Sequence, residues 1–146
     1  MLRAMAIQTG GLFDREILAD ELCLVRLEEA ALARVLISVR CMPAALPVFI
    51  HLTDHHVLLA SDEEAVIEAA RRGDVLAVQV DGADGDRDTW SVQATGVAHL
   101  PNLDDALGVL GTNSKLASSL DRGASLIAIS LMVVSGEQVH WTFPRG

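Results

Sequence analysis

Residues 35–60 have the sequence VLISVRCMPAALPVFIHLTDHHVLLA, in which three apolar runs are separated only by short turn signals. Runs rich in Val, Ile and Leu, bounded by Pro, Asp and Thr, are typical of consecutive antiparallel strands. We therefore predict strands over 34–39, 44–52 and 57–60. Pro47 has no backbone N–H to donate, so it indicates an edge or a bulge in the second of these strands.

A helix is predicted directly after the third strand. Ser61 and Glu64 have the spacing of a capping box, in which each side chain accepts a hydrogen bond from the other residue's backbone N–H. Arg71 and Arg72 would lie in the last turn, and Gly73 is a typical helix stop. Acidic residues at the start and basic residues at the end also match the helix dipole.

The rest of the chain predicts further strands and peripheral helices. The pattern of apolar residues and turn signals predicts an amphipathic helix over 14–33, a helix over 103–110 and partial helix over 111–123. It predicts strands over 75–80 and 90–100, joined by a Gly/Asp loop over 81–88, with a bulge at Gly96. The chain closes with a predicted hairpin of 124–134 and 138–143 around Ser135 and Gly136. Six or seven strands with two or three helices indicate a mainly β fold, a small antiparallel barrel. We expect one domain over 1–146, with 1–13 as a flexible N-terminal arm.

Composition indicates an aliphatic core and a surface covered by a partner. Hydrophobic residues make up 51% of the 146 residues, aromatic residues only 3%, and the mean hydropathy is +0.35. Such a chain favours a homodimer, because a second copy is the simplest cover for apolar surface. The net charge of −9 argues against a nucleic-acid partner. No apolar run approaches the ~18 residues of a membrane span, and without a signal-peptide pattern we expect the cytoplasm.

Three histidines near one turn raise the question of a metal site. His51, His55 and His56 lie close to Asp54 in the sequence. Adjacent strand residues face opposite sides, so at most His51 and one neighbour could converge with the carboxylate on a metal or haem. Solvated turn histidines are the simpler interpretation, and we predict no metal site.

The remaining candidate chemistry is also explained structurally. Cys23 and Cys41 lack metal-ligand spacing and are expected to be structural thiols. The Asp-rich loop 81–88 lacks the distal Glu of an EF-hand, so a solvated hairpin turn is expected. Because the chain has no G-x-S-x-G turn and no phosphate-binding Gly-rich loop, hydrolase and nucleotide-triphosphate functions are not indicated. No catalytic residue can be assigned.

Five segments taken in order carry a family resemblance. They are the acidic, Cys-containing segment 18–39, the strand 45–48 (ALPV), Ser61 with its helix running to Asp74 and the strand 75–81 (VLAVQVD), the strand 90–96 (WSVQATG), and 134–141 (VSGEQVHW). Their order and spacing resemble the pyridoxamine 5′-phosphate oxidase-related family of FMN-binding split β-barrels. The resemblance covers nearly the whole chain.

The resemblance implies a flavoprotein and an oxidoreductase function. Members are homodimers that bind FMN, or in some branches a deazaflavin or haem, in two clefts between the subunits. Carried onto this sequence, the resemblance implies that Pro47, Val48 and Phe49 contact the flavin ring. It implies that Ser61 contacts the phosphate. It also implies that Trp90 or Trp141 of the second subunit lies near the ring. The residues themselves leave other roles open, namely a strand-edge breaker for Pro47, a helix cap for Ser61 and core packing for the tryptophans.

Two departures from the family pattern affect the expected cofactor. Asp62, Glu63 and Glu64 stand where flavin-binding members usually have Lys or Arg, and their charge would repel a phosphate of about −1.5 to −2. Phe49 replaces a polar residue that would hydrogen-bond the ring. We therefore predict a weak or empty flavin site, and a cofactor-free split-barrel dimer that binds a small molecule or a partner is the alternative. Whether the protein is an enzyme stays open.

Overall fold

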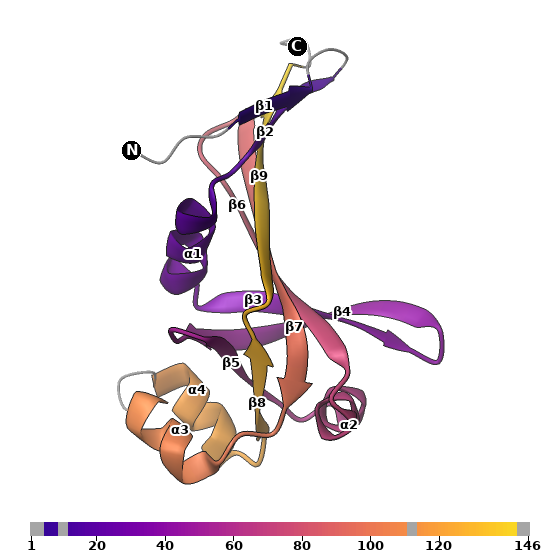
Figure 1. The fold of residues 1–146 in the computed structure, drawn as a ribbon, viewed down its shortest axis with the longest axis vertical. Coiled ribbons are helices and arrows are strands. Elements are labelled where there is room, and N and C mark those ends of the chain that lie inside the picture. Colours follow the sequence, from indigo (N-terminus) through magenta and orange to yellow (C-terminus); the bar gives the residue numbers. More distant parts are fainter. Residues whose placement is uncertain (1–4, 9–11, 111–113, 143–146) are drawn as a thin grey trace.

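The computed structural model describes residues 5–8, 12–110 and 114–142, which form nine strands and four helices (Figure 1). The strands are β1 (Met5–Gln8), β2 (Phe13–Ile17), β3 (Leu32–Val39), β4 (Met42–Leu52), β5 (His56–Ser61), β6 (Val75–Ala83), β7 (Asp88–His99), β8 (Ser125–Ser130) and β9 (Val133–Trp141). The helices are α1 (Asp20–Glu29), α2 (Glu64–Arg72), α3 (Leu103–Leu110) and α4 (Ser114–Asp121). None of the described helices is both long and apolar enough to cross a membrane.

Six of the strands close into an antiparallel barrel. Their order is β3, β4, β5, β8, β7 and β6, and the pairing of β6 with β3 completes the ring. The long strand β7 pairs with β9 over residues 88–95 and with β8 at Ala98 and His99. β9, β2 and β1 continue the sheet beyond the barrel and, with the adjoining halves of β6 and β7, form an extension that we call the blade (Figure 1). This split barrel confirms the predicted mainly β fold class.

The position of Gly96 explains how the barrel can close. It pairs in regular register with Leu76 of β6, so the predicted bulge is wrong. A Cβ built on Gly96 would lie 1.6 Å from the backbone oxygen of Ser130, the last residue of β8. The glycine is therefore needed for the close approach of the two backbones at the point where β7 changes partner.

Two apolar clusters hold the helices on the barrel. Cys23 and Leu27 of α1 and Val66 of α2 belong to the larger cluster, which fills the barrel and the base of the blade. The smaller cluster, here called the α3–α4 core, joins α3 and α4 to β5 and β8, and Phe49 packs against it. Its buried members are Leu58, Ala60, Ala106, Leu116, Leu126 and Ala128. Burial of aliphatic side chains on this scale provides most of the favourable free energy of folding.

The predicted helix over 14–33 is only partly correct. Residues 13–17 form β2, which pairs with both β1 and β9, and the helix α1 covers Asp20–Glu29 alone. Along α1, Val25 is 39% exposed, whereas Cys23 and Leu27 are fully buried. Pairing with β9, more than a hundred residues away, helps to decide the conformation of 13–17, and a local apolar pattern cannot report it.

Two other predictions at the chain ends are also corrected. Ser135 and Gly136 lie inside β9 rather than in a turn, and β8 does not pair with β9 but with β5 and β7. Within the segment expected to be a flexible arm, residues 5–8 form β1 and pair with β2. Residues 1–4 and 9–11 of that segment, together with 111–113 of the partly helical segment and Phe143 of the predicted last strand, lie outside the described residues.

The two cysteines have different surroundings. Cys23 is completely buried on the inner face of α1. Burial raises the pKa of its thiol, and the nearby Asp20 carboxylate raises this pKa by a smaller amount. Cys41 is exposed in the tight turn between β3 and β4, where its φ is 64°. Both thiols are free. The buried thiol is therefore a packing group, which agrees with the structural role expected for it.

Candidate functional site

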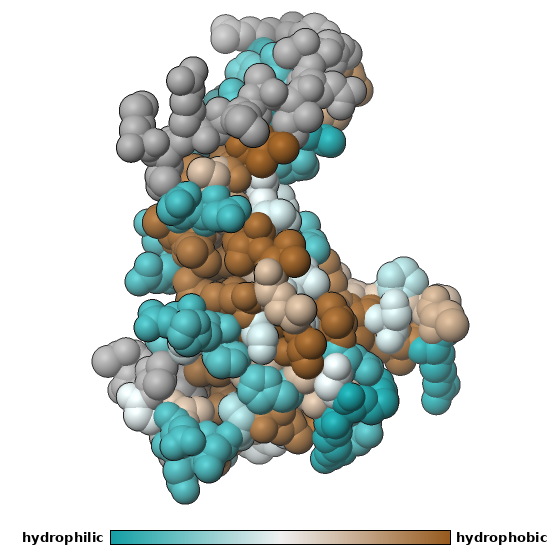
Figure 2. Space-filling view, in the orientation of Figure 1, coloured by the Kyte–Doolittle hydropathy of each residue, from teal (hydrophilic) through white to brown (hydrophobic). Residues whose placement is uncertain are grey.

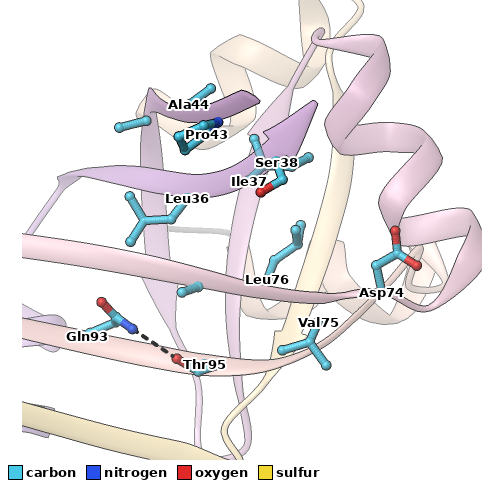
Figure 3. A pocket seen from close by; sticks show the side chains of 12 residues that line it. Leu36, Ile37, Ser38, Pro43, Ala44, Asp74, Val75, Leu76, Gln93 and Thr95 are labelled. Atoms are coloured by element: carbon cyan, nitrogen blue, oxygen red, sulfur yellow. Dashed lines mark hydrogen bonds between the residues drawn. The ribbon is translucent and has the colours of Figure 1, made fainter. Parts of the chain in front are cut away.

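An open groove with a volume of about 770 Å³ runs along β3, β4, β6 and β7 (Figure 3). Its polar side chains include Gln93 and Thr95, which hydrogen-bond each other. The one carboxylate in the groove, Asp74, forms an ion pair of 2.8 Å with Arg72. Among the described residues, this groove therefore presents apolar and neutral polar groups but no uncompensated charge.

A second pocket, of about 510 Å³, gathers four of the residues that the family resemblance selects. Pro47, Val48 and Phe49 reach it from β4, and Ser61 reaches it from the end of β5. Because side chains alternate along a strand, the buried Val48 and the half-buried Phe49 point to opposite sides of β4. The pocket lies where β4, β5 and α4 meet, and we call it the Arg122 pocket after a residue described below.

Ser61 lies beside the helix but does not cap it. The side chain is buried, and its Oγ accepts a 3.1 Å hydrogen bond from the backbone N–H of Glu63. The N-cap residue of α2 is Glu63, which makes no side-chain capping bond, so the predicted capping box is wrong. The helix stop is correct, because Gly73 adopts φ 73° and its N–H bonds back to the last turn. Ser61 thus holds the turn that leads from β5 into α2.

We expect Ser61→Ala to lower the free energy of unfolding by about 1 kcal/mol, because the Glu63 N–H loses its acceptor in this partly buried hydrogen bond. The measurement is chemical denaturation of the two proteins. Ser118→Ala, at an exposed position of α4, is the matched control and should leave the midpoint unchanged. Equal stability of Ser61→Ala and the natural protein would show that water replaces the hydroxyl at no cost.

Two cations that the sequence analysis did not select lie at this site. Arg122, directly after α4, lines the Arg122 pocket, and it also lines an adjoining pocket of about 540 Å³ that is bordered by Phe49, Lys115, Ser118 and Ser119. The Nζ of Lys115 lies 5.3 Å from the centre of the Phe49 ring. Among the described residues, none of the ion pairs includes Lys115 or Arg122. Uncompensated cations beside a pocket favour the binding of anions there.

The missed cations had no usable signal in the sequence. Residues 111–123 are polar and weakly patterned, and Lys115 and Arg122 are separated from Ser61 by more than fifty positions. The seven-residue spacing of the two cations would have shown that they share a helix face, because seven residues are about two turns. It could not have shown that this face meets β4.

Carboxylates also line the same pocket. Asp62 and Glu63 line the Arg122 pocket, as predicted from their position after Ser61. Glu64 does not line it, because its carboxylate lies 3.4 Å from Arg71 on the exposed face of α2. The charges of the pocket therefore come from different elements, with Arg122 directly after α4 and the two carboxylates between β5 and α2.

The two tryptophans lie on the blade and contact other residues of their own chain. The Arg26 guanidinium stacks 4.4 Å from the centre of the Trp90 ring. The Nε1 of Trp141 donates a 2.9 Å hydrogen bond to Thr89, and its ring packs on Phe13. Neither tryptophan lines the Arg122 pocket of its own chain. Their predicted contact with a flavin bound to a second subunit stays a prediction.

The histidines and the Asp-rich loop do not assemble a metal centre in the described part of the chain. No group of three or more His, Cys, Asp or Glu side chains there is placed to hold a metal ion. The rings of His56 and His99 face each other, with their centres 5.3 Å apart. In the loop, Asp84 forms an ion pair with Arg26.

The barrel and its charged pocket define a class, a split-barrel domain with a pocket between β4, β5 and α4 that Arg122 and two carboxylates line. The sequence pattern of the pyridoxamine 5′-phosphate oxidase family matches residues 19–112, well over half of the chain, and the chain belongs to this family. A comparison with curated proteins gives no match.

Solved structures with the same fold are distant in sequence. An FAD-binding protein from Mesorhizobium loti is 22% identical, with a TM-score of 0.68 over 86% of this chain and 96% of that one. An FAD-binding protein from Mycobacterium smegmatis is 20% identical, with a TM-score of 0.62 over 86% and 98% of the two chains. An FAD- and heme-binding protein from the same organism is 17% identical, with a TM-score of 0.62 over 88% and 74%. At these identities the likeness concerns the fold.

Proposed function

We propose that the protein binds a flavin cofactor in the Arg122 pocket and serves as a flavin-dependent oxidoreductase. The observation that carries the proposal is the pair of uncompensated cations, Lys115 and Arg122, beside the strand 47–49 that the family uses for the flavin. Family membership and the names of the structural neighbours as FAD-binding proteins support it. A flavin supplies the redox chemistry when bound, and the chain supplies binding and orientation.

The charge layout of the pocket suits a phosphorylated, hydroxyl-rich ligand. Arg122 and Lys115 offer N–H donors for phosphate oxygens, and charge-assisted hydrogen bonds of this kind are the strong ones. Asp62 and Glu63, which line the same pocket, are acceptors for hydroxyl groups, so they need not oppose a sugar-like chain that lies beside them. Phe49 separates the two adjoining pockets and offers a ring face for stacking.

The two pockets together leave room for either common flavin. The Arg122 pocket alone is of about 510 Å³, and the adjoining pocket adds about 540 Å³ beside Lys115. FMN carries one phosphate, which Arg122 would hold, whereas FAD carries a second phosphate, which Lys115 would hold. We propose FMN or FAD as the cofactor, and a comparison of the two affinities decides between them.

We further propose that the protein is a homodimer and that its second copy covers the groove of Figure 3. Val75, Met132 and Val133 are 58–64% exposed, and they flank Thr95 of β7, in the groove. Figure 2 shows apolar residues gathered over the middle of the face of the molecule that it presents. Exposed apolar side chains grouped in this way are typical of a subunit interface.

Sedimentation velocity followed at two wavelengths tests both parts of the proposal. After incubation with FMN or FAD, the flavin absorbance should sediment with the protein at the mass of a dimer. Val133→Glu, which places a charge on the apolar face, should shift the protein to the monomer. Flavin that stays unbound at micromolar protein would contradict the cofactor and favour a cofactor-free dimer, and a monomeric natural protein would contradict the second copy.

A further inference from the structure

A pair of histidines lies at the end of the barrel that carries α3. His56 begins β5 and His99 ends β7, and their ring centres are 5.3 Å apart with an interplanar angle of 71°. Both side chains are half-buried. They line a pocket of about 360 Å³ together with Thr53, Leu58, Leu100, Pro101, Asn102, Asp105, Ala106 and Ala128.

Few charges face the histidine pair. From α3, Asp105 lines the pocket, but it makes no ion pair with either imidazole among the residues that the structure describes. From the β4–β5 turn, His55 is exposed next to His56, and Asp54 is exposed beyond it. β8 contributes only the apolar Ala128. The pKa of His56 is lowered, mainly by burial and to a smaller extent by the neighbouring His99 and His55. The packed arrangement therefore opposes protonation of His56.

The pair is connected mechanically to the candidate flavin site. Ala106 of α3 packs in the α3–α4 core with Leu58 and Ala128, which also line the histidine pocket. Leu116 of α4 is in the same cluster, and Phe49 packs against it while lining the Arg122 pocket. A displacement of α3 therefore disturbs the core that positions α4. Lys115 of α4 and Arg122, directly after α4, border the candidate flavin site.

We propose that His56 and His99 form a pH-sensitive latch, which holds α3 against the barrel while both rings are neutral and releases it when they are protonated. Two imidazolium rings at this separation repel each other, and in the released state water can solvate both charges. Release of α3 loosens α4 and weakens flavin binding. This last step rests on the proposed function, whereas the release of α3 does not.

Hydrogen–deuterium exchange of the flavin-free protein tests the latch. After correction for intrinsic rates, exchange in α3 should be about fivefold faster or more at about pH 5.5 than at about pH 7.5. The double variant His56→Gln/His99→Gln should lose this pH response, and His140→Gln, which removes an exposed histidine on the blade, should keep it. An equal pH response in the natural protein and the double variant would overturn the latch. If the double variant folds poorly, His99→Gln alone gives a second measurement: the NMR titration of His56 should move to higher pH, and an unchanged titration would also overturn the latch.

Flavin affinity measured at the same two pH values tests the coupling separately. The dissociation constant should rise about threefold or more at the lower pH in the natural protein and less in the double variant. Unchanged affinity with a loosened α3 would overturn the coupling while the latch stands. No flavin binding at either pH would contradict the proposed function, and the exchange experiment on the flavin-free protein would still decide the latch.

Discussion

Replacing Lys115 and Arg122 together by Gln is expected to weaken flavin binding about 100-fold, or about 2.8 kcal/mol. Each cation should contribute about tenfold through charge-assisted hydrogen bonds to phosphate, because neither is engaged in an ion pair among the described residues. Both side chains are exposed, so part of their charge effect is lost to solvent screening. Fluorescence titration of FMN and of FAD gives the affinities, and the affinity of the natural protein should fall with added salt more steeply than that of the double variant.

The matched control is the double variant Arg40→Gln/Arg71→Gln. It removes the same total charge, at the β3–β4 turn and on the solvent face of α2, and neither residue lines the Arg122 pocket. Similar losses in both double variants would show that only net charge matters, and the phosphate would not lie beside α4. If the Lys115 change affects FAD more than FMN, the adjoining pocket holds the second phosphate.

Gly96→Ala is expected to destabilise the fold strongly. The added Cβ would lie 1.6 Å from the Ser130 oxygen and 2.7 Å from its carbonyl carbon, and both are backbone atoms that cannot rotate away. Overpacking usually costs about 1–3 kcal/mol, and here it forces apart the two strands whose pairing closes the barrel, so we expect the upper end of that range or more. The measurement is thermal or chemical denaturation followed by circular dichroism.

Gly108→Ala is the matched control for this substitution. Gly108 lies within α3, and a Cβ there meets no atom within 4 Å. Alanine should therefore be neutral or stabilising by up to about 1 kcal/mol, since it favours helix more than glycine does. A Gly96→Ala protein with the unfolding midpoint of the natural protein would mean that β7 and β8 can separate at this point without loss.

Only the part of the candidate site whose residues lie close together in the sequence could be predicted from the sequence. The strand 45–49 and Ser61 are joined by one turn and one strand, so the resemblance could place them together, and they do line one pocket. Arg122 and Lys115 come from a helix that reaches the pocket only through the α3–α4 core. The expectation of a site without cations therefore overlooked charges that the tertiary structure supplies.

The amino-acid sequence by itself determined the elements whose signals are local. The apolar runs of 35–60 form β3, β4 and β5, and Gly73 ends α2, because alternation, turn residues and a left-handed glycine act over a few neighbouring positions. Only the tertiary structure decided that 13–17 is a strand, that Gly96 faces Ser130, and that Arg122 meets β4. These depend on hydrogen bonds and packing between segments far apart in the chain, whose free energy exceeds the weak local preferences and leaves no pattern within any one segment.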